Sequence, residues 1–481
     1  MENRNLAAIV LAAGLGTRMR SKHAKVLHLL GGLPMIARSL GAVSALKAWP
    51  IVVVVGHQAA EVEAAARANS GTPLTFALQP RLRGTGDSAR HGLAAIPEHF
   101  TGDVLICYGD VPMVTSETLA AFCSAHRQSG AALSFVSVRL AEPSAYGRVV
   151  RDPAGRVQAV VEARDASAAQ RAINEINTGF YCADLRFLRA ALAELKTDNA
   201  QGEFYLTDIV TIARARGLEV NAWVADDPLE FAGVNSREEL ANMEAQIREQ
   251  TNRKLMAAGV TLIDPATAYI SEQAQVAADV VIGPNVQILG RCRIGEGVQI
   301  DGTAWLKEVE IGPRCHLKIG VRAEQCRIGE DSEIGPFANL REGTDLEGHN
   351  RIGNFVETKK ARIGRGTKAS HLSYLGDAVI GRETNVGCGV ITVNYDGYDK
   401  HETRIGDRCM IGCDTQLIAP ITVGSDVYVA SGTTIVRAAT DGALVMSHHP
   451  QREKPGWMQK WRERHNDPTP VKRSDQQRSS G

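Results

Sequence analysis

Residues 282–300 read IGPNVQILGRCRIGEGVQI, and an aliphatic side chain returns at every sixth position of this stretch. Six-residue recurrence is typical of a parallel β-helix, in which each aliphatic side chain stacks above its equivalent one coil earlier and small residues form the corners. The second half of the chain is therefore predicted to be a β-helical solenoid. The recurring residues are Ile270, Val276, Ile282, Ile288, Ile294, Ile300 and Leu306; Ile328, Ile334, Leu340, Leu346 and Ile352; and Ile405, Ile411, Leu417, Val423, Val429 and Ile435.

The six-residue register breaks near Glu310, between residues 317 and 327, and between residues 394 and 404. Insertions into solenoids usually form loops on one face, and this is often the binding face. We therefore expect the chemistry of this half to lie where the repeat is interrupted.

The first half of the chain has a different period, because β-branched strands alternate with helical stretches. This alternation is typical of a doubly wound, mostly parallel sheet. Ligands of such sheets bind beyond the carboxyl ends of the strands, where residues 14–25 and Gly109-Asp110 fall. The predicted elements are strands at Leu6–Leu11, Ile51–Val55 and Val104–Tyr108 and helices at Pro34–Lys47 and Ala59–Ala68.

Four segments are predicted along the chain. Residues 1–235 form the α/β domain, and residues 236–258 form a connecting helix that begins with a capping box of Ser236 and Glu239. Residues 259–449 form the solenoid. Residues 450–481 are a basic, polar tail that is partly disordered or packs by anchors such as Trp457 and Trp461.

Composition excludes several classes of protein. The 481 residues include 54 Lys plus Arg and 54 Asp plus Glu, so no net positive field attracts nucleic acid or acidic lipid. The sequence contains no apolar span long enough for a membrane helix and no secretion signal. Its nine cysteines form no CxxC pair, which disfavours disulfides and a zinc site. We expect a cytoplasmic protein that binds neither nucleic acid nor membranes.

A glycine-containing turn follows the first predicted strand. Residues 11–19 read LAAGLGTRM, and Lys25 lies beyond them. The backbone amides of this turn, together with Arg18 and Lys25, could hold a polyphosphate. The turn is not a dinucleotide fingerprint, because Met19 stands where a third glycine is needed, and it lacks the Gly-Lys-Ser/Thr of a P-loop.

Further short motifs follow this turn in a fixed order: Gln79 with RGTG at 83–86, YGDVP at 108–112, YGR at 146–148, Val161-Glu162, EINTG at 175–179 and GVN at 233–235. The set resembles the motifs of sugar-1-phosphate nucleotidyltransferases. With the hexapeptide half included, residues 5–450 resemble the bacterial family of bifunctional N-acetylglucosamine-1-phosphate uridyltransferases and glucosamine-1-phosphate acetyltransferases. The resemblance implies a Rossmann-like nucleotidyltransferase domain followed by a left-handed parallel β-helix with three hexapeptides per coil.

This resemblance implies a uridylyl-transfer site in the first half. One group of residues holds UTP and its phosphates, a second surrounds N-acetylglucosamine-1-phosphate, and Asp110 and Asn235 hold Mg²⁺. Oxygen ligands of this kind suit Mg²⁺, and phosphoryl transfer needs cations because both reactants are anions. The nucleotide group is Leu11, Ala12, Ala13, Gly14, Arg18, Lys25, Gln79, Gly84, Thr85 and Tyr108, and the sugar group is Gly147, Glu162, Asn177 and Asn235.

The resemblance also implies an acetyl-transfer site in the solenoid, with His371 as the catalytic base. Histidine titrates near neutrality, as proton removal from an amine requires. The residues that match glucosamine-1-phosphate positions are Arg341, Lys359, Tyr374 and Asn385, and those that match acetyl-CoA positions are Cys388, Asn394, Tyr395, Cys413, Ser431 and His448.

Several positions depart from the family pattern. In the first half, Asp87 replaces a histidine and adds a carboxylate that could weaken nucleotide binding or alter metal binding. In the second half, Glu342 replaces a proline beside Arg341, and His448 replaces an arginine that contacts the cofactor, so a permanent charge is lost there. The remaining replacements are Cys388 for Ala, Cys413 for Ser and Ser431 for Ala.

The resulting prediction is a bifunctional enzyme that acetylates glucosamine-1-phosphate with acetyl-CoA and then joins the product to UTP, releasing pyrophosphate. The family implies a homotrimer with acetyl-transfer sites between subunits, and a product, UDP-N-acetylglucosamine, that supplies peptidoglycan and lipopolysaccharide. One alternative is a monofunctional uridylyltransferase whose solenoid is only an oligomerisation scaffold. Another is a non-enzymatic assembly subunit with decayed sites.

Overall fold

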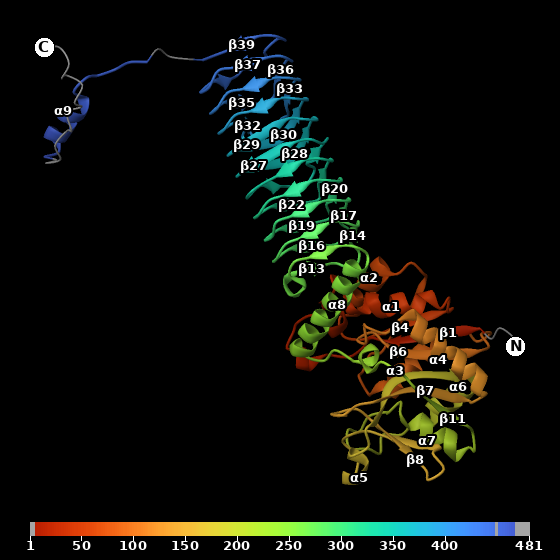
Figure 1. The fold of residues 1–481 in the computed structure, drawn as a ribbon. Coiled ribbons are helices and arrows are strands. Elements are labelled where there is room, and N and C mark those ends of the chain that lie inside the picture. Colours follow the sequence, from red (N-terminus) through yellow and green to blue (C-terminus); the bar gives the residue numbers. More distant parts are fainter. Residues whose placement is uncertain (1–4, 448–450, 467–481) are drawn as a thin grey trace, which may run out of the picture. The chain divides into compact units, whose positions relative to one another are not determined.

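Residues 5–447 and 451–466 are described by a computed structural model, in which the chain divides into two units (Figure 1). The first unit comprises Met1–Ala257 and Tyr269–Gln273 and is called the α/β unit below. The second comprises Ala258–Ala268 and Ala274–Gly481 and is called the solenoid unit. Of the helices in the described part of the chain, none has the length and apolar composition needed to cross a lipid bilayer.

The α/β unit is built on a nine-stranded mixed sheet with the order β11-β7-β10-β6-β1-β4-β5, and β8 and β9 lie off this path. Strands β6, β1, β4 and β5 are parallel, whereas β10 is antiparallel to β6 and β7. The strands are β1 (Leu6–Leu11), β4 (Ile51–Val55), β5 (Leu74–Leu78), β6 (Asp103–Tyr108), β7 (Leu133–Arg139), β8 (Arg148–Arg151), β9 (Val157–Val161), β10 (Glu175–Asp184) and β11 (Val220–Val224).

Both faces of this sheet are covered by helices, as its buried strands require. Ala8 and Val10 of β1 pack into one apolar cluster, and Ile9 and Leu11 pack into another on the opposite face. The first cluster receives α1 (Met35–Ala45), α2 (Ala59–Asn69) and α4 (Ser116–Ser129), and the second receives α3 (Thr85–Ala94), α6 (Leu185–Glu194) and α7 (Asp208–Ala215).

Shorter elements complete this unit. Helix α8 (Arg237–Ala257) begins with the predicted capping box, because Ser236 Oγ accepts from the Glu239 amide at 3.1 Å and Glu239 Oε2 accepts from the Ser236 amide at 3.2 Å. The others are η1 (Thr17–Met19), η2 (Lys25–Leu27), β2 (Leu29–Leu30), β3 (Leu33–Pro34), α5 (Ala168–Arg171), η3 (Pro228–Phe231) and β13 (Tyr269–Ile270).

The solenoid unit is a stack of short parallel strands (Figure 1). In-register partners such as Ile282 with Ile300 and Ile334 with Ile352 are 18 residues apart, which is three hexapeptides per coil. One face holds β12 (Thr261–Leu262), β15 (Val281–Ile282), β18 (Gln299–Ile300), β21 (His316–Leu317), β24 (Glu333–Ile334), β27 (Arg351–Asn354), β29 (Lys368–His371), β31 (Asn385–Val386), β34 (Met410–Ile411), β37 (Tyr428–Val429) and β39 (Leu444–Val445).

The other strands of the stack are β14 (Gln275–Val276), β16 (Gln287–Leu289), β17 (Arg293–Ile294), β19 (Trp305–Lys307), β20 (Glu310–Ile311), β22 (Arg322–Glu324), β23 (Arg327–Ile328), β25 (Asn339–Leu340), β26 (Asp345–Leu346), β28 (Glu357–Ile363), β30 (Tyr374–Ile380), β32 (Ile391–Val393), β33 (Thr403–Ile405), β35 (Gln416–Ile418), β36 (Ile421–Val423) and β38 (Thr434–Ile435), with η4 (Pro265–Thr267) near the start of the unit.

The three predicted breaks in the repeat have different outcomes. Around Glu310 and residues 317–327 no loop forms, because Ile300 pairs with Leu317 and Leu317 with Ile334, so each coil is merely one residue shorter. Between Asn385 and Met410 the coil is 25 residues long, seven more than 18, and the extra residues form a loop closed by a bridge between Tyr395 and Lys400.

The described part of the tail contains α9 (Trp457–Arg464). The expected anchors are not buried, since Trp457 is 51% exposed and Trp461 is 40% exposed. The Trp461 ring instead stacks on His465, with ring centroids 4.4 Å apart. The prediction that these residues act as packing anchors therefore finds no support in the described residues.

Candidate functional site

A pocket of about 330 Å³ lies beyond the carboxyl end of β6 in the α/β unit. Its lining comes from the ends of β6 and β9, the middle of β10, η1, η3, the first residue of α3, and the loops that lead into β8, α7 and α8. Eight residues predicted from the sequence line it: Arg18, Thr85, Tyr108, Asp110, Gly147, Glu162, Asn177 and Asn235.

Lys25 connects the two predicted metal ligands. Its Nζ forms an ion pair with Asp110 and donates to Asn235 Oδ1 at 2.9 Å. The Asn235 amide group is oriented by a second, longer contact from its Nδ2 to the Gly233 carbonyl at 3.4 Å. A carboxylate and an amide oxygen that are distant in sequence therefore converge on one cationic group.

Burial raises the pKa values of three side chains in this pocket, Glu162, Tyr108 and Tyr146. Desolvation raises the pKa of Glu162, although a hydrogen bond from the Thr207 hydroxyl at 3.2 Å opposes the shift. Burial likewise raises the pKa values of the Tyr108 and Tyr146 phenols. The pocket is thus a poorly solvated place in which new negative charge is costly unless a cation accompanies it.

An irregularity in β10 exposes Asn177 to the pocket. The register of β10 against β7 shifts between Asn177 and Tyr181, so the ladder is interrupted there. Asn177 Nδ2 donates to the Tyr181 hydroxyl at 2.8 Å, and the Asn177 amide donates to the Gly147 carbonyl at 2.9 Å. These bonds hold two predicted sugar-binding residues side by side.

The glycine-containing turn lies outside the pocket lining. Leu11, Ala12 and Ala13 are buried, and the Ala12 amide is used by the sheet because it donates to Val54 O at 2.9 Å. Gly14 is exposed. Among the described residues, the amides of Ala13, Gly14, Leu15 and Gly16 donate to no backbone carbonyl, so they are available donors of the turn.

Gln79 and Gly84 also lie outside the pocket lining, close to Asp87. Gln79 Nε2 donates to Asp87 Oδ2 at 2.9 Å and to the Gly84 carbonyl at 3.3 Å. Arg83 Nη2 contacts Asp87 Oδ1 at 2.9 Å. The side chain of Asp87 is only 2% exposed. The carboxylate expected to disturb the nucleotide or the metal is therefore turned inward and paired with protein groups.

Some lining residues were absent from the sequence-based set of site residues. Tyr146 lies in the YGR motif, but the sequence assigned it no ligand. For the loop before α7, the polar pair Thr207-Asp208 directly after the apolar Leu206 was the sequence feature that could have pointed to the pocket. The missed lining residues are Val111, Ala145, Tyr146, Thr178, Gly179, Tyr181, Leu206, Thr207, Phe231 and Gly233.

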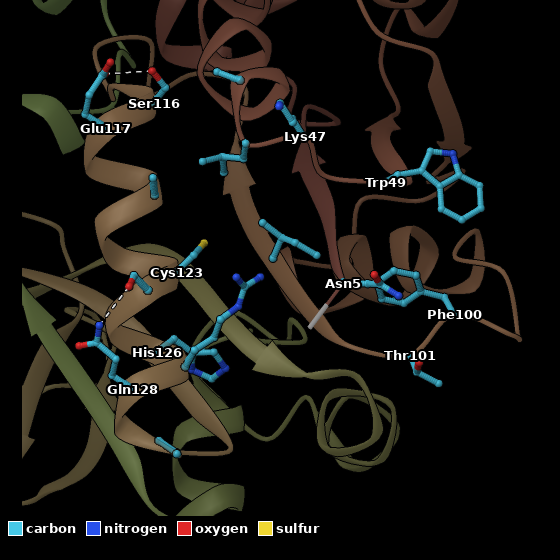
Figure 2. A pocket seen from close by; sticks show the side chains of 18 of the residues that line it. Asn5, Lys47, Trp49, Phe100, Thr101, Ser116, Glu117, Cys123, His126 and Gln128 are labelled. Carbon is cyan, nitrogen blue, oxygen red and sulfur yellow. Dashed lines mark hydrogen bonds between the residues drawn. The ribbon is translucent and has the colours of Figure 1, made fainter. Parts of the chain in front are cut away.

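A larger cavity of about 1240 Å³ lies elsewhere in the α/β unit (Figure 2). It is bordered by residues that precede β1, β4 and β6 and by α4, including Asn5, Trp49, Thr101 and Glu117. No predicted site residue lines it. In parallel sheets ligands bind at the opposite, carboxyl edge of the strands, so size does not make this cavity the functional site.

In the solenoid unit, His371 is exposed at the end of β29. Lys368 pairs in register with Asn385, Asn385 with Met410, and Met410 with Tyr428. The residues three positions after these four are therefore also equivalent in consecutive coils. They are His371, Cys388, Cys413 and Ser431, which we call the His371 column. The predicted base and three predicted acetyl-CoA residues are thus neighbours along the stack.

The two predicted phosphate-binding cations occupy equivalent positions of adjacent coils, because Leu340 and Thr358, which precede them, pair in register. Lys359 Nζ contacts Glu342 Oε1 at 3.0 Å, and Arg341 Nη1 contacts Glu357 Oε1 at 2.8 Å. Arg341 Nε lies 3.8 Å from Glu342 Oε2. The hydrogen bond from Lys359 lowers the pKa of Glu342. Both cations are therefore already engaged by carboxylates.

A polar group joins the 394–404 loop to β30. Asn394 Nδ2 contacts Asp377 Oδ2 at 2.5 Å and the Tyr374 hydroxyl at 3.4 Å. Tyr395 is exposed in the same loop. Asn385, one coil after Lys368, contacts the Met410 sulfur at 3.2 Å. His448, expected at the cofactor, lies outside the described residues.

A third group of acidic and imidazole side chains, Glu330, Asp331 and His349, lies close enough together to suggest a metal site. Arg314 contacts both oxygens of Asp331 at 2.8 and 2.7 Å, and Arg365 contacts Glu330 at 3.1 Å. Because these arginines already neutralise the carboxylates, the group is an ion-pair cluster on the solenoid surface.

Comparisons with known proteins cover both units. Residues 8–258 match the family of MobA-like NTP transferase domains, residues 265–379 match the GMPPB C-terminal domain, and residues 402–437 match the bacterial transferase hexapeptide with six repeats. The solenoid is accordingly a hexapeptide β-helix, and the predicted fold, a left-handed parallel β-helix, is confirmed.

Relatives matching nearly the whole chain carry the name bifunctional protein GlmU. That of Pelobacter propionicus is 45% identical over 94% of this chain and 98% of its own length. Those of Geobacter metallireducens and Corynebacterium glutamicum are 48% and 42% identical over 95% of this chain and 99% and 94% of their own lengths. The comparisons favour a bifunctional transferase over the monofunctional alternative. The chain belongs to the family of bifunctional GlmU proteins, with an NTP transferase domain and a hexapeptide transferase domain in one polypeptide.

Proposed function

We propose that this protein acetylates glucosamine-1-phosphate with acetyl-CoA and then transfers UMP from UTP to N-acetylglucosamine-1-phosphate, releasing pyrophosphate. We assign uridylyl transfer to residues 1–235 and acetyl transfer to residues 259–449, with residues 236–258 as the connecting helix and 450–481 as the tail. The observation that carries the first assignment is that eight residues expected at a uridylyl site line one pocket.

Uridylyl transfer needs cationic support, since a sugar phosphate attacks the α-phosphorus of another anion. Arg18 and Lys25 supply permanent positive charge, and Gly147, Glu162 and Asn177 are assigned to the sugar. Among the residues assigned to the nucleotide, Arg18, Thr85 and Tyr108 line the pocket, whereas Ala13, Gly14 and Gln79 lie outside its lining. No general base is required because the attacking phosphate is already ionised.

The residues proposed to bind Mg²⁺ fit such an ion. Asp110 and Asn235 present oxygen atoms to the same cationic group, Lys25 Nζ, so the two oxygens are close enough to share one cation. Mg²⁺ prefers oxygen ligands and keeps several waters, which two protein ligands allow. When bound, the ion would neutralise phosphate charge in the weakly solvated pocket.

Acetyl transfer is assigned to the surface around the His371 column. The amine of glucosamine-1-phosphate attacks the thioester carbonyl, and His371 accepts the proton that the amine loses. Arg341, Lys359, Tyr374 and Asn385 are assigned to the sugar phosphate. Acetyl-CoA is assigned to Cys388, Asn394, Tyr395, Cys413, Ser431 and His448, with a backbone amide near Cys388 stabilising the oxyanion.

We further propose that the solenoid forms a homotrimer. An exposed apolar stripe at one corner of successive coils supports this: Ile319, Phe337, Phe355 and Leu372 are each 48 to 59% exposed. The rings of Phe337 and Phe355 stack with centroids 5.8 Å apart. Contiguous exposed apolar side chains of this kind mark protein–protein contact sites, which supports the use of this corner as a subunit interface.

Two assays on one preparation test the enzymatic proposal. Thiol release from acetyl-CoA with glucosamine-1-phosphate reports acetyl transfer, and pyrophosphate release from UTP with N-acetylglucosamine-1-phosphate reports uridylyl transfer. We expect both in the wild-type protein. Uridylyl transfer without acetyl transfer at any acetyl-CoA concentration would favour the scaffold alternative.

Sedimentation of the Phe337→Asp, Phe355→Asp double variant tests the proposed trimer. Negative charge on the apolar stripe should dissociate the trimer into monomers.

A further inference from the structure

Asp87 and Gln79 form a buried pair next to the turn into α3. Their side chains are almost fully enclosed, with relative exposures of 2% for Asp87 and 4% for Gln79. Asp87 Oδ2 accepts from Gln79 Nε2 at 2.9 Å, and Asp87 Oδ1 accepts from Arg83 Nη2 at 2.9 Å. An ionised carboxylate can only accept hydrogen bonds, so the atom of Gln79 that faces Asp87 must be the donor Nε2.

A second acceptor faces the same amide nitrogen. The Gly84 carbonyl lies 3.3 Å from Gln79 Nε2 and also has no proton to give. If the carboxamide were reversed, its oxygen would face two acceptors and both hydrogen bonds would be lost, which is costly for buried groups. The hydrogen-bond network therefore determines the orientation of this amide, with Nε2 toward Asp87 and Oε1 away from it.

The remaining atom, Gln79 Oε1, has no hydrogen-bond partner among the described residues. It is also absent from the enclosed polar atoms that lack a partner, so it retains some access to solvent. A largely buried glutamine with both amide hydrogens in use and its carbonyl oxygen available can only accept a hydrogen bond from a ligand.

The free acceptor Gln79 Oε1 would discriminate between nucleotide bases by whether they can donate a hydrogen bond to it. Uracil carries a hydrogen on N3 and can donate it, whereas N3 of cytosine is itself an acceptor. We propose that Asp87 is a positioning residue that holds the Gln79 carboxamide with Oε1 toward the base, and that this orientation makes the site select uracil over cytosine nucleotides. The inference rests on the proposed role of Gln79 in uridine binding.

The test compares kcat/KM for UTP with that for CTP, using N-acetylglucosamine-1-phosphate as acceptor. Asp87→Ala frees the amide to rotate and should lower the UTP-to-CTP ratio by about tenfold or more, because sites that pair a ligand N–H discriminate strongly. Asp87→Asn still offers an oxygen to Gln79 Nε2 and should stay close to the wild-type ratio. Asp87→Ser, too short to reach Gln79, is measured in parallel in case the alanine variant does not fold.

Arg83→Gln is the matched control. It removes the other side chain that hydrogen-bonds to Asp87 without touching Gln79, so the ratio should not change. A folded Asp87→Ala or Asp87→Ser variant that keeps the wild-type ratio would overturn the inference, as would an Arg83→Gln variant that lowers the ratio equally. Wild-type protein that uses UTP and CTP equally well would also overturn it. Wild-type protein that turns over no UTP would instead refute the proposed function.

Discussion

In the α/β unit, Asp110, Glu162 and Asn177 line one enclosed pocket, whereas in the solenoid unit His371, Cys388 and Cys413 are exposed on the outer surface of successive coils. The pKa shifts of one glutamate at each candidate site differ in cause. Burial raises the pKa of Glu162, but a hydrogen bond from Lys359 lowers the pKa of Glu342. A sheet edge with long loops can desolvate a site within one chain, while a solenoid coil presents its residues to solvent and pairs them with neighbouring charges.

The largest effect expected is that of His371→Ala. Loss of a general base should reduce acetyl transfer by about 10²- to 10⁴-fold. Uridylyl transfer should be unchanged, because His371 belongs to the solenoid unit and the pocket proposed for uridylyl transfer belongs to the α/β unit. Both rates are measured on the same sample. Loss of both activities with the fold intact would break the assignment of one reaction to each unit.

Asp110→Ala makes the opposite test. Removing the carboxylate that converges with Asn235 on Lys25 should lower uridylyl transfer by about a hundredfold or more, because metal-ion neutralisation supplies several kcal/mol to such reactions. Acetyl transfer should continue at the wild-type rate. Pyrophosphate release measured against Mg²⁺ concentration gives the result, and near-normal release would remove Asp110 from the proposed metal site.

Glu342→Gln should produce a smaller effect. In the proposed role of Lys359, the incoming phosphate displaces the Glu342 carboxylate from it, and partly exposed ion pairs of this kind are worth about 0–1 kcal/mol. We expect the KM for glucosamine-1-phosphate to fall by up to about fivefold with kcat unchanged. Glu347→Gln, which removes a carboxylate paired with Arg362 elsewhere on the solenoid, is the control and should leave KM alone. An unchanged KM in Glu342→Gln would show that the carboxylate does not compete.

Glu162→Gln should give the smallest effect, on stability. The folded-state pKa of Glu162 is raised, so ionisation costs the folded state more than the unfolded state. Wild-type stability relative to the variant should therefore fall as pH rises above the ordinary glutamate value. Thermal melts of both proteins from pH 4 to pH 8 should show a variant that melts a few degrees higher at neutral pH, with no such advantage in acid. A difference independent of pH would assign the effect to packing instead.

Much of the fold could be predicted from periodicity. The strands at residues 6–11 and 51–55 have the predicted bounds, and the capping box of Ser236 and Glu239 is present, because these features depend on neighbours in sequence. The loop at residues 394–404 was also expected. The shortened coils near Glu310 and residue 317 were not recognised as such, since deleting one residue from a corner leaves the stacking intact.

The sequence by itself determined the two periods of the chain, and with them an α/β unit followed by a hexapeptide solenoid, because hydrophobic recurrence directly reflects which side chains can be buried. Only the tertiary structure decided which polar groups pair. Lys25 meets Asn235 across 210 positions, Asp87 turns inward to Gln79, and Glu342 lies on Lys359. These pairings depend on how close the side chains lie in the folded chain and on how far they are removed from water, and a short sequence motif specifies neither.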